Sequence, residues 1–173
     1  MNLKNLLFIG LVCSARSAFG QQFDTTYGKP LIVLTEFSPW LTVINSDMPS
    51  FALYEKGQVV YQTVENEQLN IYEVTLSKKE LQKMIQSLRI KDEVYKLEKY
   101  ILASDWSDQT TTDLYLNIAV PKTISVYGNL EQKEVRKRTP KAFLRVYDEI
   151  KRYKNPNAHK ILVSSGFFFP NLK

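Results

Sequence analysis

The stretch SFALYEKGQVVY, residues 50–61, carries the clearest structural signal in the chain. Phe51 and Leu53 alternate with Ala52 and Tyr54, which is the period of a β-strand with two different faces. Gly57 is placed in a tight turn where a positive φ is needed, and residues 58–64 return as a second strand. The stretch therefore predicts an antiparallel hairpin.

The segments that follow predict further strands and two amphipathic helices. Ser77 and Glu80 match a capping box, in which a serine caps a helix and a glutamate lies three residues later, so a helix is expected over residues 77–88. A second helix is expected over residues 140–153, with Thr139 as its cap and Pro140 at its first position. The expected strands, apart from the hairpin, span residues 31–37, 69–76, 113–120, 123–127 and 160–164.

The order of these elements predicts an α+β fold, an antiparallel β meander with two amphipathic helices packed on one face. Residues 91–102 permit a short helix, residues 103–112 are expected to form a loop, and residues 131–138 are expected to be a charged linker. A single α+β domain is expected over residues 21–173, with its core at about 31–153.

The first twenty residues have the pattern of a secretory signal peptide. A cationic residue, Lys4, precedes an apolar run over residues 6–12, and Ala18 and Gly20 are the small residues expected before a cleavage site. The run is too short to span a membrane, and we expect no transmembrane segment. The chain is therefore predicted to be exported, to the periplasm or the outside of the cell.

Cys13 leaves a second interpretation of this segment open, a lipoprotein anchored at that cysteine. Gly10 and Val12 stand where lipoprotein signals favour leucine and a small residue, so we favour simple cleavage. Cleavage would remove the one cysteine together with Lys4 and Arg16, and the net charge of +5 would fall to +3. A charge of this size does not indicate a nucleic-acid partner.

The composition excludes most catalytic chemistries that depend on cysteine or histidine. His159 is the one histidine, and it is expected in a loop, so a nucleophile with a paired histidine base is not indicated. We expect no metal and no cofactor, because the chain has neither a zinc ligand pattern nor a glycine-rich phosphate loop.

Loop aspartates and tryptophans are the remaining candidates for a binding site. Carboxylate oxygens suit calcium, and a tryptophan beside acids suits a sugar, whereas turn formation explains the same aspartates without a ligand. The candidate residues are Asp47, Asp105, Trp106, Asp108 and Asp113.

A basic patch extends across the expected linker and the second helix. Acidic residues interrupt it, and Arg145–Glu149 and Asp148–Arg152 are spaced for ion pairs along a helix, so a solvated face is favoured over a site for anions. The cations of the patch are Lys133, Arg136, Lys137, Arg138, Lys141 and Arg145.

Several short segments of the chain together resemble a family of small exported bacterial proteins and lipoproteins of uncharacterised function. The hairpin PSFALYEKGQVVY at residues 49–61 resembles that family's P-x-F-x-L-Y-x-x-G-x-V-x-Y pattern, and LSKKEL at residues 76–81 resembles its helix start. DQTTT at residues 108–112 and KTISVYG at residues 122–128 resemble its next two strands. The resemblance implies a fold and brings no activity with it.

Two functions are compatible with these features. The first is a non-catalytic exported domain that binds a protein or a component of the cell envelope, through tyrosines expected on exposed strand faces: Tyr54, Tyr61, Tyr72, Tyr115 and Tyr127. The second is a carboxylate-dependent hydrolase or a calcium-binding domain that uses the loop aspartates. We favour the first, because no nucleophile–base pair is visible.

Overall fold

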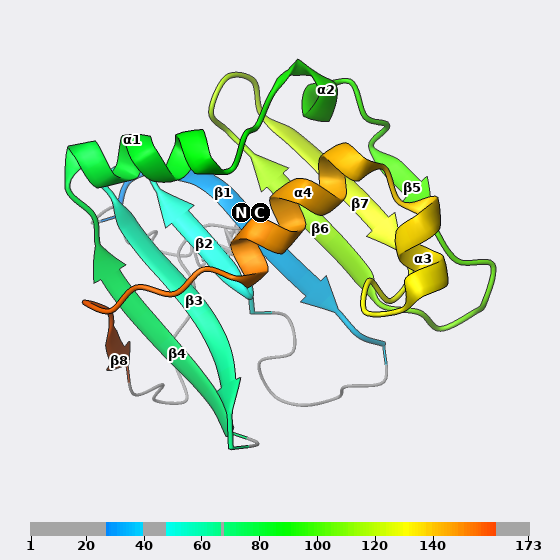
Figure 1. The fold of residues 1–173 in the computed structure, drawn as a ribbon, viewed down its shortest axis with the longest axis horizontal. Coiled ribbons are helices and arrows are strands. Elements are labelled where there is room, and N and C mark those ends of the chain that lie inside the picture. The colour runs from blue at the N-terminus through cyan, green and yellow to red at the C-terminus, as the bar shows by residue number, and fades with distance from the viewer. Residues whose placement is uncertain (1–26, 40–47, 67, 162–173) are drawn as a thin grey trace, which may run out of the picture.

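The computed structural model describes residues 27–39, 48–66 and 68–161, and these form one sheet covered by helices (Figure 1). The strands of this part of the chain are β1 (Pro30–Phe37), β2 (Phe51–Tyr54), β3 (Gln58–Glu65), β4 (Gln68–Thr75), β5 (Tyr100–Leu102), β6 (Thr111–Leu116), β7 (Lys122–Tyr127) and β8 (His159–Ile161). Its helices are α1 (Lys78–Ser87), α2 (Asp92–Tyr95), α3 (Lys133–Arg138) and α4 (Lys141–Lys151). Within the described ranges, none of these helices has the length and apolar character that a membrane span requires.

The strand order is β5-β7-β6-β1-β2-β3-β4-β8, which confirms the predicted α+β fold with a mostly antiparallel sheet. The meander runs from β1 to β4, and the β6–β7 hairpin adds to the other side of β1. β5 then pairs with β7 in parallel, so the sheet is mixed at this edge. The short helix permitted over residues 91–102 is present as α2, whereas β5 is not expected from the sequence, because three residues carry too little pattern to predict a strand.

The turn between β2 and β3 depends on Gly57. Its φ is 92°, and a Cβ at this position would lie 2.4 Å from the carbonyl oxygen of Leu76. The Leu76 amide in turn donates to the Gly57 carbonyl at 2.8 Å. The predicted glycine turn is confirmed, and it also fixes the end of β4 where the chain enters α1.

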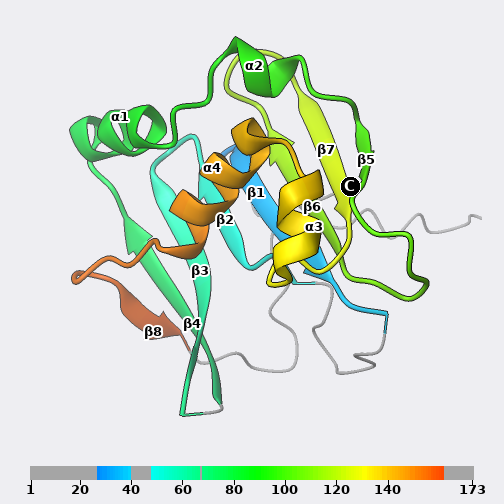
Figure 2. The same ribbon diagram turned by 45° about the vertical axis from the view of Figure 1, so that its right-hand side comes forward.

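The two faces of the sheet are covered differently. The face that carries Phe51 and Leu53 belongs to the large core beneath the helices, whereas Ala52 and Tyr54 belong to a smaller cluster on the opposite face. Figure 2 shows α1 and α4 on the same side of the sheet. The smaller cluster consists of Val33, Ala52, Tyr54, Val60 and Ile71, all of them buried. The β2–β4 half of the sheet is therefore apolar on both faces.

The predicted capping box at the start of α1 is confirmed. The Glu80 amide donates to the Ser77 hydroxyl at 3.4 Å, and the Ser77 amide donates to the Glu80 carboxylate at 2.8 Å. The hydrogen bonds from Ser77 hold the pKa of Glu80 below its usual value. Two backbone donors at the helix start are thereby satisfied by side chains.

The predicted linker over residues 131–138 is wrong, because α3 occupies most of it. The expected roles of Thr139 and Pro140 are also wrong. The Thr139 hydroxyl donates back to the Val135 carbonyl at 2.8 Å and so ends α3, while Pro140 is the N-cap of α4. Buried Val135 gives α3 its contact with the core, and one apolar residue among charges is too weak a period to reveal a helix from sequence.

α4 is the central element of the helical layer. Its apolar face places Phe143, Val146, Tyr147 and Ile150 in the large core. At about 1.5–3 kcal/mol for each buried side chain, this face contributes roughly 6–12 kcal/mol before conformational entropy is subtracted. α1 contributes fewer fully buried side chains, because only Met84 of the helix and Leu88 at its C-cap are buried, while Leu81 and Ile85 are partly exposed.

We expect Phe143→Ala to be far more destabilising than Leu81→Ala. Phe143 has an exposed fraction of 0%, so its truncation leaves a cavity that costs about 3–5 kcal/mol of unfolding free energy. Partly exposed Leu81 is expected to cost about 1 kcal/mol. Urea denaturation with linear extrapolation measures both, and equal losses would contradict the assignment of α4 as the main helical contact.

Candidate functional site

Three of the predicted site residues lie in the loop between β5 and β6, and a fourth lies in β6. Asp105, Trp106 and Asp108 are all exposed in that loop, whereas Asp113 is part of β6. Asp47 lies outside the described residues. Across the three described ranges, no three acidic, histidine or cysteine side chains lie together in a way that could hold a metal ion.

Asp105 is bound to α3. Its two carboxylate oxygens accept from the two terminal nitrogens of Arg138 at 2.6 and 3.0 Å, a bidentate ion pair. The hydrogen bonds and the charge of Arg138 hold the pKa of Asp105 below its usual range. Asp105 therefore anchors the loop to α3, and its carboxylate is occupied by the ion pair with Arg138.

Asp108 and Asp113 have local roles of different kinds. Asp108 has a φ of 58°, a left-handed conformation that aspartate tolerates in turns. Asp113 faces Thr35 on β1 and Ser125 on β7 in the strand register, and its Oδ1 is buried without a hydrogen-bond partner. Asp113 thus brings a carboxylate to the face of the sheet that the helices leave uncovered.

Trp106 is the most exposed of the large hydrophobic side chains in the described part of the chain, at 78%. Tyr100 and Leu102, both 54% exposed, lie on β5, and Phe37, 47% exposed, lies at the end of β1. Together with half-buried Tyr127 these residues form what we call the aromatic surface: Phe37, Tyr100, Leu102, Trp106 and Tyr127.

The strand register brings these residues together. Leu102 is opposite Tyr127, Tyr127 is opposite Thr111, and Thr111 is opposite Phe37, which gives one row across four strands. Three strand spacings make this row about 14 Å long. The neighbouring residues Ile101, Val126 and Ile124 point to the helix-side core, so the row lies on the opposite face of the sheet.

Hydrogen bonds fix Trp106 beside this row. The Tyr127 hydroxyl donates to the Trp106 carbonyl at 3.1 Å and accepts from the Gln109 amide at 3.2 Å. The Trp106 amide donates to the Ser104 hydroxyl at 3.2 Å. With Asp105 held by Arg138, the backbone of Trp106 is anchored from both sides while its indole remains exposed.

The tyrosines expected on exposed strand faces behave unequally. Tyr54 and Tyr61 are buried, which corrects the sequence interpretation. Tyr54 belongs to the smaller cluster and packs edge-on against Tyr27, and Tyr61 stacks on Tyr72 and packs edge-on against Tyr153. Strand alternation gives the face of a residue but does not reveal that both faces of β2 and β3 are covered.

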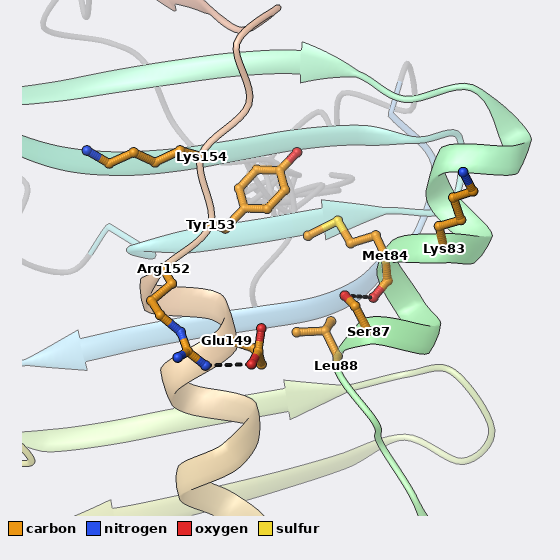
Figure 3. Close-up of a pocket in the computed structure, with 8 residues that line it drawn as sticks. All are labelled: Lys83, Met84, Ser87, Leu88, Glu149, Arg152, Tyr153 and Lys154. Atoms are coloured by element: carbon orange, nitrogen blue, oxygen red, sulfur yellow. Dashed lines mark hydrogen bonds and ion pairs between the residues drawn. The ribbon is translucent and has the colours of Figure 1, made fainter.

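A shallow groove of about 350 Å³ lies between α1 and the end of α4 (Figure 3). Met84, Leu88 and Tyr153 line it. Its cations do not converge, because the ammonium groups of Lys83 and Lys154 point to opposite sides of the groove (Figure 3). Arg152 is already paired with Glu149. The groove therefore has no concentrated charge that would select a ligand.

The structure also brings together two carboxylates that the sequence did not reveal. The Tyr147 hydroxyl lies 2.9 Å from Glu36 Oε1 and 3.4 Å from Glu131 Oε1, and the Lys151 ammonium lies 2.7 Å from Glu36 Oε2. Burial and the nearby carboxylates raise the pKa of Tyr147 well above its ordinary value. Since Tyr147 itself is buried, this cluster ties α4 to β1 and to the segment before α3.

The predicted basic patch is mostly neutralised by ion pairs. The two ion pairs expected along α4, Arg145–Glu149 and Asp148–Arg152, are wrong. Arg145 pairs with Glu93 of α2 instead, and Asp148 pairs with Arg136 of α3. The cation–anion pairs of this region are Arg136–Asp148, Lys137–Glu134, Arg138–Asp105 and Arg145–Glu93. Three of these pairs join different elements, and together the pairs use four of the six cations of the patch.

His159 opens β8, where a loop was expected. Its Nε2 lies 4.0 Å from the Glu73 carboxylate of the neighbouring strand, and its side chain is largely exposed. A single exposed histidine beside one carboxylate indicates a cross-strand contact at the edge of the sheet.

Comparisons with known protein families, with curated proteins and with solved structures find no match to this chain. We therefore infer its function from its sequence and from the residues of the site.

We expect Arg138→Gln to loosen the loop that carries Trp106. Without the bidentate pair to Asp105, amide hydrogen exchange of residues 105–109 should speed up, while global stability changes little because both partners are exposed. Lys137→Gln is the matched control, since its pair with Glu134 lies within α3. Equal exchange in both variants would show that Arg138 does not anchor the loop.

We expect Tyr147→Phe to lower the free energy of unfolding by about 1–2 kcal/mol at neutral pH, because a donor to a charged carboxylate is lost.

The raised pKa of Tyr147 also predicts an effect on stability at high pH. A pKa raised in the folded state gives stability that is present below the unfolded value near 10 and lost as the pH rises above it. Denaturant titrations from pH 7 to 11 should therefore show a shallower alkaline loss for Tyr147→Phe than for wild type. The exposed Tyr100→Phe is the control, and an identical alkaline loss in the two variants would contradict the prediction.

Proposed function

We propose that this chain is a non-catalytic binding domain that holds a protein partner on the aromatic surface. The observation that carries the proposal is the exposure of Trp106, Tyr100, Leu102 and Phe37 in one region of the sheet. Isolated exposed hydrophobic residues are ordinary, but a contiguous group with an aromatic centre is typical of an interaction site.

The anchoring of the loop supports the same proposal. A tryptophan contributes most to an interface when it is presented in a fixed position, since less freedom is lost on binding. Tyr127 and Arg138 fix the backbone on either side of Trp106 without covering its ring. An indole at 78% exposure contributes little to packing within the described part of the chain.

The charges around the surface favour a protein over a strongly anionic partner. Arg138 reaches the loop of Trp106 through Asp105, and that carboxylate matches its charge. A nucleic acid or an anionic membrane would need unmatched cations over an extended area. Apolar and aromatic contacts are left as the main source of affinity.

The proposal includes the cellular context that the N-terminal sequence supports. Residues 1–20 have the composition of an export signal, and the motifs at residues 49–61, 76–81, 108–112 and 122–128 resemble a family of exported bacterial proteins. A partner outside the cytoplasm, such as another exported protein or a protein of the cell envelope, follows from that context.

Site-specific photo-crosslinking tests the proposal. Trp106 is replaced by p-benzoylphenylalanine in the cells that produce the chain, and Lys133, exposed on α3, is replaced in a matched control. We expect a discrete protein adduct at position 106 that is absent at position 133. The same adducts at both positions, or none at position 106, would refute the proposed surface.

Trp106→Ala supplies the quantitative test once a partner is isolated. Central aromatic residues of interfaces cost about 2 kcal/mol or more when truncated, so affinity should fall by at least tenfold. Titration calorimetry of the purified pair measures the loss, and circular dichroism confirms that the fold is unchanged. A loss below threefold would remove Trp106 from the interface.

A further inference from the structure

β5 leaves one side of its backbone without a partner strand in the described part of the chain. It is the terminal strand of the sheet, next to β7. The Ser125 amide donates to the Lys99 carbonyl at 2.8 Å, and the Ala103 amide donates to the Tyr127 carbonyl at 2.9 Å. Since alternate residues of a strand bond to the same side, the amides and carbonyls of Tyr100 and Leu102 point away from β7.

The edge has only part of the usual protection against pairing: β5 is short and exposed Lys99 precedes it, but its own side chains offer none. Natural edge strands commonly carry charged residues, prolines or bulges that discourage another strand from adding. Residues 100–103 read YILA and contain none of these, and Tyr100 and Leu102 are each 54% exposed. β8, at the other end of the sheet order, carries His159 and Lys160 instead.

We propose, on the basis of the function proposed above, that the partner supplies an extended segment that pairs with β5 as an additional strand. Its main chain bonds to the outward amides and carbonyls of Tyr100 and Leu102, and its alternate apolar side chains lie on Tyr100, Leu102 and Trp106. An extended peptide fits this edge. The outward backbone groups of alternate residues in β5 are about 6.6–6.8 Å apart, and the backbone groups of a second strand have the same spacing.

The short length of β5 explains why the edge and the surface act together. Three residues offer few backbone bonds, so pairing alone gives weak binding. The apolar side chains beside the edge add the burial that makes the contact specific. Backbone pairing in turn fixes the orientation of the partner's segment, which apolar contacts alone would not define.

Proline substitution at position 102 separates the backbone contribution from the side-chain contribution. Leu102→Ala removes the side chain alone, whereas Leu102→Pro also removes the outward amide and leaves the bonds of Lys99 and Ala103 to β7 in place. Replacing Leu102 by its α-hydroxy acid, which exchanges the amide for an ester, removes the same donor with the side chain kept. This third variant keeps the test valid if the proline variant fails to fold.

The probe is a capped octapeptide of alternating valine and threonine, and the control is the same peptide N-methylated at alternate amides. We expect the probe to slow amide exchange at Tyr100 and Leu102 at least tenfold and the control peptide to have no effect. We also expect Leu102→Pro to bind the probe at least tenfold more weakly than Leu102→Ala does. The ester variant should bind it at least tenfold more weakly than wild type does. Binding without this protection, or equal binding by all variants, would overturn strand addition.

The crosslinking result at position 106 distinguishes the two proposals. An adduct at Trp106 that survives equally in Leu102→Pro and Leu102→Ala refutes strand addition and leaves the aromatic surface as a binding site. Absence of any adduct at position 106 refutes the proposed function itself. Loss of the adduct in Leu102→Pro alone supports both.

Discussion

β1 pairs with β2 along one side and with β6 along the other, and α4 crosses the sheet above it (Figure 1). The meander and the β6–β7 hairpin are therefore joined through one strand, and the burial of α4 stabilises that junction. Tyr147 and Lys151 of α4 both contact Glu36 near the end of β1, which adds polar contacts to the apolar packing of Phe143 and Ile150. If this packing failed, neither half of the sheet would have enough buried surface of its own.

Local patterns were sufficient to predict the elements whose signals lie within a few residues. The hairpin around Gly57, the capping box of Ser77 and Glu80, and the apolar face of α4 follow from turn chemistry and periodicity, and the structure confirms them. β5 and α3 were not predicted, because both are short and their stability comes from neighbours distant in sequence. β5 exists through its parallel pairing with β7, and α3 through one buried valine and the pairs Arg136–Asp148 and Arg138–Asp105.

The candidate site was likewise predictable only in part: residues close together in the sequence were indicated, and residues joined by the strand register were not. The sequence indicated the polar loop with Asp105, Trp106 and Asp108, since its composition is unusual within ten residues. It did not indicate Phe37, Tyr100 or Leu102, because these join Trp106 only through a register that spans four strands. It also placed Tyr54 and Tyr61 on exposed faces, whereas the smaller cluster buries Tyr54 and the helix-side core buries Tyr61.

The unequal covering of the sheet connects its architecture to the binding surface. In the β2–β4 half, most apolar residues on both faces are buried, and the exposed exceptions, Val64 and Leu69, lie opposite each other where β3 ends and β4 begins. In the β5–β7–β6 half, the helices cover one face, while the opposite face carries Tyr100, Leu102 and Tyr127. α3 links the two sides, since Arg138 extends from the helical layer to the loop of Trp106, and Tyr127 extends to the same loop from the sheet. The exposed tryptophan is thus held by both layers at the edge where the sheet ends, which is the position from which one side chain can contact a segment added to β5.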